Sequence, residues 1–242
     1  MAIIPQYGDP TLQAMYKHIE ETQHKNEKRD YLGASLIGNE CARQIWYQYN
    51  GYEQEPFSAE TLMNFEDGHR TEDLTAERLR MVEGVDLVTH GDDGKQLGFK
   101  ALGGKFKGHY DGIITGILQA PKTKHIWEAK ASGEKKWNEF TKLKNTVDDK
   151  KILQNWNTNY YVQANLYMHY EQIDRHYLTL SYAGGRKYQS CRTEYDPAVA
   201  ARAIDRADKI INATQAPPRL SEKPDFWICR WCNFKDECHG NK

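Results

Sequence analysis

Long apolar runs are absent from the 242 residues of this sequence. No window approaches the roughly 20 apolar residues that a membrane-spanning helix needs. The opening stretch, MAIIPQYGDP, has neither the basic start nor the apolar core of a signal peptide. We therefore expect a cytoplasmic protein with no membrane partner.

The sequence also has little net charge. The formal charge is -1 at pH 7, so no overall field points to a nucleic-acid partner. The distribution is less even, because acidic residues predominate from 53 to 93 and lysines from 122 to 151. This asymmetry fits either a polyanion that binds one side of the protein or two solvated helical faces.

Cysteine is scarce, with five copies. An odd number in a reducing compartment argues against a disulfide framework and favours metal binding. Three copies lie together as Cys229-x2-Cys232-x5-Cys238, but three thiolates seldom complete a metal site. Cys41 stands alone far upstream, and we expect Cys191 to be an ordinary, partly buried thiol.

The length suits one elaborated domain, which we divide into a helical part (1–84), a core (85–195) and a C-terminal helix with the cysteine segment (196–242). Apolar residues at helical spacing predict helices at 10–24, 35–51 (capped by Ser35 or Asn39), 58–82 and 155–170. Asp196 followed by Pro197 predicts the start of another helix.

Short β-branched and aromatic runs, broken by glycine, are typical of strands. They predict largely antiparallel strands at 85–90, 96–102, 105–118 and 125–131. Two further runs predict a hairpin that turns at Gly184–Gly185.

Two of these strands carry residues suited to metal chemistry. Residues two apart on a strand share a face, so Glu128 and Lys130 point to one side of 125–131, and Asp111 can lie beside Glu128 if the neighbouring run pairs with it. Hard divalent ions such as Mg²⁺ prefer carboxylate oxygens. The lysine could orient an attacking water or stabilise transition-state charge. An ion-paired surface hairpin is the alternative interpretation.

A second Glu-x-Lys match, Glu134 and Lys136, follows closely. We favour Glu128 and Lys130 because apolar residues flank them, and we assign the second match to a charged loop. His69, on the helix before the strands, is another candidate metal ligand. Gln163 and Tyr167 share one helical face at i, i+4 spacing.

In chain order, these residues form the series Cys41, His69, Asp111, Glu128-x-Lys130, Gln163-x3-Tyr167 and Cys229-x2-Cys232-x5-Cys238. The series resembles the PD-(D/E)XK nucleases of the RecB-like branch that carry an iron-sulfur cluster. Among them are the CRISPR-associated RecB-like exonucleases, the AddB-type nuclease domain and related phage exonucleases. The proline-aspartate that names the superfamily is replaced here by Tyr110-Asp111.

The resemblance implies an α/β fold with a restriction-endonuclease-like mixed β-sheet flanked by helices. It implies that His69, Asp111, Glu128 and the carbonyl of Ala129 bind Mg²⁺ or Mn²⁺, and that Lys130 is the catalytic lysine. Gln163 and Tyr167 match the helical motif beside the active site.

The resemblance also makes Cys41 the fourth ligand, with Cys229, Cys232 and Cys238, of a 4Fe-4S cluster that joins the N- and C-terminal segments. Spacing alone does not separate iron-sulfur from zinc, because both accept four cysteines.

The function implied is a metal-dependent deoxyribonuclease, an exonuclease on single-stranded DNA ends. The alternative is a nuclease-fold binding module in a CRISPR adaptation or recombination complex, with little or no cutting. Helicase, recombination or CRISPR adaptation proteins are the expected partners besides DNA.

Overall fold

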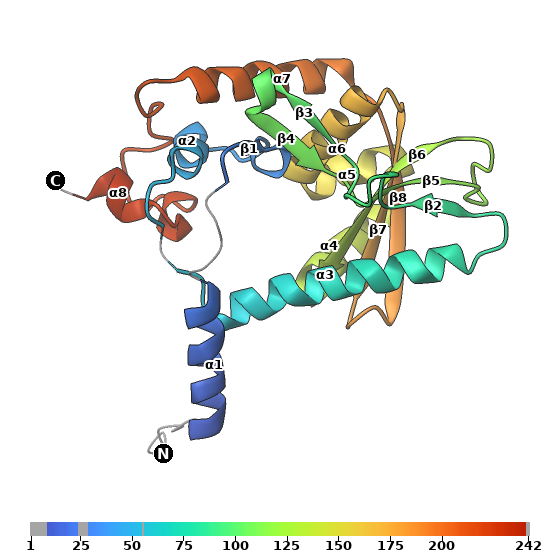
Figure 1. The fold of residues 1–242 in the computed structure, drawn as a ribbon, viewed down its shortest axis with the longest axis horizontal. Helices are drawn as coiled ribbons and strands as arrows, with labels where there is room; N and C mark the ends of the chain where they lie inside the picture. The colour runs from blue at the N-terminus through green and yellow to red at the C-terminus, as the bar shows by residue number, and fades with distance from the viewer. Residues whose placement is uncertain (1–8, 24–28, 55, 241–242) are drawn as a thin grey trace.

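The computed structural model describes residues 9–23, 29–54 and 56–240, which form a mixed α/β structure (Figure 1). The helices are α1 (Pro10–Gln23), α2 (Ala42–Asn50), α3 (Ala59–Arg80), α4 (Glu134–Lys144), α5 (Ile152–Trp156), α6 (Thr158–Glu171), α7 (Pro197–Asn212) and α8 (Lys235–His239). The strands are β1 (Leu32–Gly33), β2 (Asp86–Val88), β3 (Gly98–Ala101), β4 (Phe106–His109), β5 (Gly112–Thr115), β6 (His125–Ser132), β7 (Arg175–Tyr182) and β8 (Lys187–Glu194).

Within the described residues, the main sheet has five strands in the order β2-β5-β6-β7-β8. β6 and β7 are parallel, and the other neighbouring strands are antiparallel. The sheet is therefore mixed, as predicted. Parallel neighbours need a long crossover, and α4, α5 and α6 provide it between β6 and β7.

A smaller sheet, three-stranded over the same described residues, has the order β1-β4-β3. The prediction of one continuous strand at 105–118 is wrong, because the chain changes sheets inside it. The Tyr110 N–H donates a hydrogen bond to the Leu97 carbonyl at 3.2 Å, which continues the pairing of β3 and β4 by one residue on each strand. Gly112 already pairs with Trp127 in the main sheet. Asp111 therefore lies at the junction of the two sheets.

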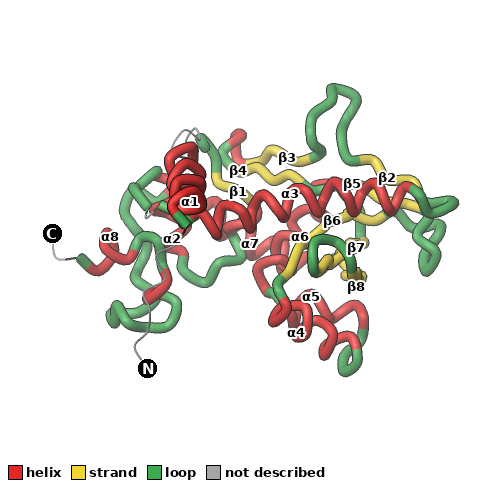
Figure 2. Tube along the Cα trace, turned by 90° about the horizontal axis from the view of Figure 1, so that it is seen from below, coloured by secondary structure: helices red, strands yellow, loops and turns green. Residues whose placement is uncertain are grey.

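Helices cover both faces of the main sheet. Apolar side chains of α3 pack with Trp127 and Ala129 on one face, and Figure 2 shows α3 crossing these strands. On the other face, Ile126, Leu178 and Leu180 pack in the larger core with α5, α6 and α7. The alternation predicted for β6 is confirmed, because odd-numbered side chains face α3 and Ile126 faces the larger core.

The predicted helix at 35–51 is shorter than expected. Ala34–Leu36 form only a 3₁₀ turn, and α2 begins at Ala42. Neither Ser35 nor Asn39 caps α2, because the Cys41 Sγ accepts the hydrogen bond from the Gln44 N–H. Asn39 lies just before the helix, and its Oδ1 accepts a hydrogen bond from the N–H of the capping residue, Cys41, at 3.0 Å.

The assignment of Glu134 and Lys136 to a loop is also wrong, because both lie in α4. The charged sequence hides a helical apolar face, on which Phe140 is buried and Trp137 packs against the core. The predicted helix at 155–170 is divided into α5 and α6, and the Asn157 side chain caps α6.

Several other elements agree with the sequence. α1 and α3 match their predicted ranges closely, and β7 and β8 form the predicted hairpin. Asp196 caps α7 by accepting from the N–H groups of Ala198 and Val199. No helix in the described part of the chain is long and apolar enough to span a membrane.

The C-terminal segment packs beside α2 (Figure 1). The Phe234 ring stacks on Tyr47 with centroids 5.7 Å apart, and Trp46 Nε1 donates to the Ala213 carbonyl at 2.9 Å. Arg43 Nη1 donates to the Pro217 carbonyl at 3.1 Å. Helix α2, near the start of the chain, is therefore in contact with residues 213–234, near its end.

Candidate functional site

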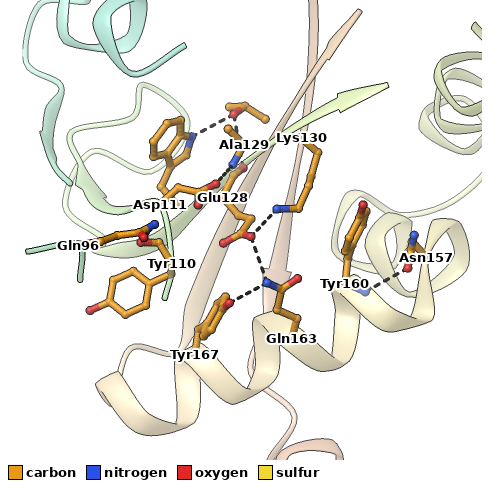
Figure 3. A network of polar contacts seen from close by, with 12 residues as sticks. Gln96, Tyr110, Asp111, Glu128, Ala129, Lys130, Asn157, Tyr160, Gln163 and Tyr167 are labelled. Carbon is orange, nitrogen blue, oxygen red and sulfur yellow. Dashed lines mark hydrogen bonds and ion pairs between the residues drawn. The ribbon is translucent and has the colours of Figure 1, made fainter. Parts of the chain in front are cut away.

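Two buried carboxylates meet where the two sheets join. Asp111 and Glu128 are only 8% and 4% exposed. Asp111 Oδ2 accepts a hydrogen bond from the Ala129 N–H at 2.7 Å, so the junction is fastened to the middle of β6 (Figure 3). The predicted pairing of the 111 and 128 regions is confirmed by the antiparallel register of β5 and β6.

Lys130 completes this centre from the same strand. Its Nζ lies 2.5 Å from Glu128 Oε1, and its side chain is 20% exposed (Figure 3). Burial tends to lower the pKa of Lys130, but the charges of Glu128 and Asp111 outweigh burial and raise it. The ammonium form is therefore strongly favoured.

Helix α6 supports Glu128 from the side. Gln163 Nε2 donates to Glu128 Oε1 at 3.3 Å and to the Tyr167 hydroxyl at 2.7 Å (Figure 3). Tyr167 can lie close to β4 because position 108 is glycine, where a Cβ would be 2.7 Å from the Tyr167 ring. The hydrogen bond between the Gln163 and Tyr167 side chains confirms that they share one helical face.

Helix α3 contributes a residue that the sequence analysis missed. Glu72 lines the same cleft as His69, Asp111 and Glu128. It follows His69 by three positions, so the two residues share a helical face. That spacing was the available signal, since a histidine and a carboxylate three positions apart on a helix can bind one metal site, as in di-iron helical bundles.

The carboxylates of Glu72, Asp111 and Glu128 repel one another, and burial in the cleft limits their solvation. Burial, followed by the charge of Asp111, raises the pKa of Glu72 to about 7. The same two causes raise the pKa of Glu128 to about 8, although Lys130 partly opposes them. Burial also raises the pKa of Asp111, while Lys130, the Ala129 N–H and His69 act in the other direction.

This donor set fits a hard divalent cation. Glu128 Oε2 is buried and has no hydrogen-bond partner among the described residues, and a buried polar atom of this kind normally has one. Mg²⁺ and Mn²⁺ favour carboxylate and carbonyl oxygens. A cation between Asp111 and Glu128 would satisfy the orphaned oxygen and relieve the repulsion. Among the described residues, however, no group of three or more His, Cys, Asp or Glu forms a preassembled metal site.

The cleft has a volume of about 680 Å³. It is lined by every predicted catalytic or divalent-metal residue except Ala129: His69, Asp111, Glu128, Lys130, Gln163 and Tyr167. Ala129 is joined to the site through its N–H, and the role of its carbonyl stays a prediction.

One wall of the cleft is basic. Arg29, Lys107 and His109 line it, and Lys107 Nζ lies 4.4 Å from the centre of the Tyr31 ring. Partial desolvation, then the charges of Arg29 and Lys107, lowers the pKa of His109. Lys107 Nζ also pairs with the exposed Asp30 carboxylate at 3.4 Å, so Arg29 and Lys107 are the groups that attract anions at the edge of the carboxylate centre.

The four predicted cluster cysteines lie elsewhere, around one small cavity between α2 and the C-terminal segment. Cys41, Cys229, Cys232 and Cys238 all line it, together with His239. Burial raises the pKa values of Cys229 and Cys232, and neighbouring cysteines raise them further. Cys191 is apart from this cavity and fully buried in the core, so the expectation of partial burial is wrong.

No protein-family model matches this sequence, and no curated protein sequence matches it. Solved structures nevertheless share its fold. The protein SSO0001 is 15% identical with a TM-score of 0.51, over 97% of this chain and 98% of that chain. The alkaline exonuclease LHK-Exo from Laribacter hongkongensis, also solved with dAMP, is 12% identical with a TM-score of 0.51, over 81% and 90%.

A phage-related exonuclease from Haemophilus somnus 129PT is 11% identical with a TM-score of 0.50, over 74% of this chain and 91% of that chain. At such identities, the likeness establishes the fold: a mixed sheet flanked by helices, as found in these exonucleases.

Proposed function

We propose that this protein is a divalent-metal-dependent deoxyribonuclease of the PD-(D/E)XK type, an exonuclease that acts on single-stranded DNA ends. The observation that carries the proposal is the convergence of buried Asp111 and Glu128 with Lys130 at the junction of the two sheets. The exonucleases that share the fold support it.

In this proposal, Asp111, Glu128 and the Ala129 carbonyl hold Mg²⁺ or Mn²⁺, with His69 and Glu72 at the same cleft. Such a cation activates water and stabilises negative charge on a phosphoryl group. Gln163 fixes the Glu128 carboxylate through its 3.3 Å hydrogen bond. Lys130 presents an ammonium that orients the attacking water or stabilises charge that develops on the phosphate.

DNA is the proposed substrate because the cleft combines two complementary walls. Arg29 and Lys107 offer positive charge to a phosphate backbone, and His109 beside them is a neutral hydrogen-bonding group. The carboxylates require a cation before a phosphate can approach. Backbone contacts of this kind are insensitive to sequence and sensitive to salt.

The direct test is degradation of end-labelled single-stranded DNA in Mg²⁺ or Mn²⁺, compared with a chelator control. We expect cation-dependent loss of the label from one end, weakened by higher salt. Protein that binds DNA but leaves it intact with both cations would refute the nuclease proposal and favour the binding module.

We further propose that Cys41, Cys229, Cys232 and Cys238 hold a metal group; the resemblance favours 4Fe-4S, and zinc is the alternative. The four thiols that line one cavity support this proposal, although in the described residues they are not preassembled as a metal site. Anaerobically purified protein should be brown and contain about four irons per chain. Colourless protein with one zinc would instead assign the site to zinc.

A further inference from the structure

The aromatic ring of Tyr160 lies next to the ammonium group of the candidate catalytic lysine, Lys130. The Lys130 Nζ lies 5.3 Å from the centre of the Tyr160 ring (Figure 3). Tyr160 precedes Gln163 by three positions on α6, so both side chains lie on the helical face that meets β6. The ring and the glutamine therefore approach the Glu128–Lys130 pair from one rigid element.

The ring has a defined position. The Tyr160 N–H donates to Asn157 Oδ1 at 3.1 Å, which fixes its backbone in the first turn of α6. Trp156 packs against the ring with centroids 5.8 Å apart. Trp156 is itself fixed by a 3.1 Å hydrogen bond from Nε1 to the Lys136 carbonyl.

Two groups thus hold the Lys130 ammonium: the Glu128 carboxylate and the Tyr160 ring. In the part of the chain that the structure describes, no other residue is within hydrogen-bond, ion-pair or ring contact of Nζ, and Asp111 attracts it only from a longer range. If Glu128 binds a divalent cation, as the proposed function requires, its hold on Lys130 weakens, because its charge is shared and the cation repels the ammonium. The ring has no such conflict, since a cation–π attraction uses the face of the ring.

We propose that Tyr160 is a positioning residue, whose ring face keeps the Lys130 ammonium at the reacting centre once Glu128 engages the metal. The inference rests on the proposed nuclease function. It assigns the effect to the ring and not to the hydroxyl group. Because the ring acts through Lys130, its loss should affect turnover and leave metal and DNA binding largely unchanged.

The test compares Tyr160→Phe with Tyr160→Leu in the metal-loaded, full-length protein. We expect Tyr160→Leu to lower kcat about 5- to 50-fold with little change in KM, because it removes the ring face. Tyr160→Phe should lose less than about threefold, because the phenyl ring also attracts a cation. Mn²⁺ affinity, measured by calorimetry, should stay within about twofold in both variants.

A double variant separates positioning from simple damage to α6. In a Lys130→Ala background, adding Tyr160→Leu should cause no further loss of activity, because the group that the ring positions is gone. An equal loss in both backgrounds would overturn the inference, as would equal activities of Tyr160→Leu and Tyr160→Phe. If wild-type protein does not cut DNA, the proposed function fails first, and that outcome is distinct.

Discussion

The Asp111 carboxylate accepts a 2.7 Å hydrogen bond from the Ala129 N–H, across the junction between the two sheets. This bond fixes the distance between two candidate metal-binding strands before any cation arrives. Asp111 thus has two roles, a structural hydrogen bond and a negative charge for metal binding. An asparagine at this position could keep the bond but would not provide the charge.

Asp111→Asn should therefore abolish metal-dependent DNA cleavage without loss of thermal stability. The asparagine carbonyl can accept the bond from Ala129, and removal of a charge relieves repulsion with Glu128. Asp111→Ala should also be inactive but should unfold more easily, by about 1–3 kcal/mol, because the Ala129 N–H loses its partner. Equal melting temperatures for the two variants would contradict this division.

Lys130→Ala should lower turnover by about two to four orders of magnitude, the range for loss of a positioned catalytic group. The structure adds a stability cost, since Glu128 would lose its ion-pair partner in a buried place. Protonation of Glu128 should limit that cost, because its pKa is already raised.

Lys136→Ala is the matched control for Lys130→Ala. Lys136 is half exposed on α4 and pairs with Glu139 at 2.8 Å, and such surface pairs contribute about 0–1 kcal/mol. DNA degradation should stay near the wild-type rate. If Lys136→Ala were inactive and Lys130→Ala active, the choice between the two Glu-x-Lys matches would be wrong.

Local patterns were sufficient for part of the site. Strand alternation places Glu128 and Lys130 together, and helical spacing places Gln163 beside Tyr167. The sheet change at Tyr110–Asp111 was not predictable, because strand-forming residues continue through it and only tertiary pairing divides them. The division of the chain at 84 and 195 stays a prediction.

Glu72 and α4 show two other limits of the sequence. α3 is polar around most of its surface, so its sequence does not show which face meets the carboxylates. In α4, charged residues outnumber the apolar ones, and the short apolar face becomes evident only where Phe140 is buried.

Glu72→Gln should reduce metal-dependent activity about 10- to 100-fold, the range for residues that support a metal site. The reason is its place in the cleft with Asp111 and its strongly raised pKa. Glu66→Gln, on the same helix, is the control, because Glu66 is exposed and pairs with Arg70 at the surface. A Mn²⁺ titration of activity should show a weaker apparent affinity for Glu72→Gln alone.

Stability without divalent cations should fall as pH rises from about 6.5 to 8. The pKa values of Glu72 and Glu128 are raised from 4.5 to about 7 and about 8. Below about pH 6.5 the lowered pKa values of His109, His125 and His176 act in the opposite direction. Above it, the two carboxyl groups make the folded protein bind more protons than the unfolded chain, so a rise in pH favours unfolding. The melting temperature should fall by a few degrees, at about 2–4 °C per kcal/mol for this size.

Added Mn²⁺ should reverse most of that decrease, and its stabilising effect should grow with pH because cations and protons compete for the same carboxylates. Glu128→Gln should show a flatter pH dependence without metal. A wild-type melting temperature that rises steadily through this pH range in chelator would contradict the arrangement.

Cys232→Ala should release the proposed metal group and loosen the contact between α2 and the C-terminal segment. The site would lose one of four thiolates, and a metal that binds only the folded state contributes directly to stability. Iron and zinc content per chain, together with the melting temperature, measure both effects.

Cys191→Ala is the control, since Cys191 lies in the core away from the cavity. It should lower stability modestly through lost packing while retaining the wild-type metal content. Equal metal content in wild type and Cys232→Ala would show that the four cysteines do not form a metal site.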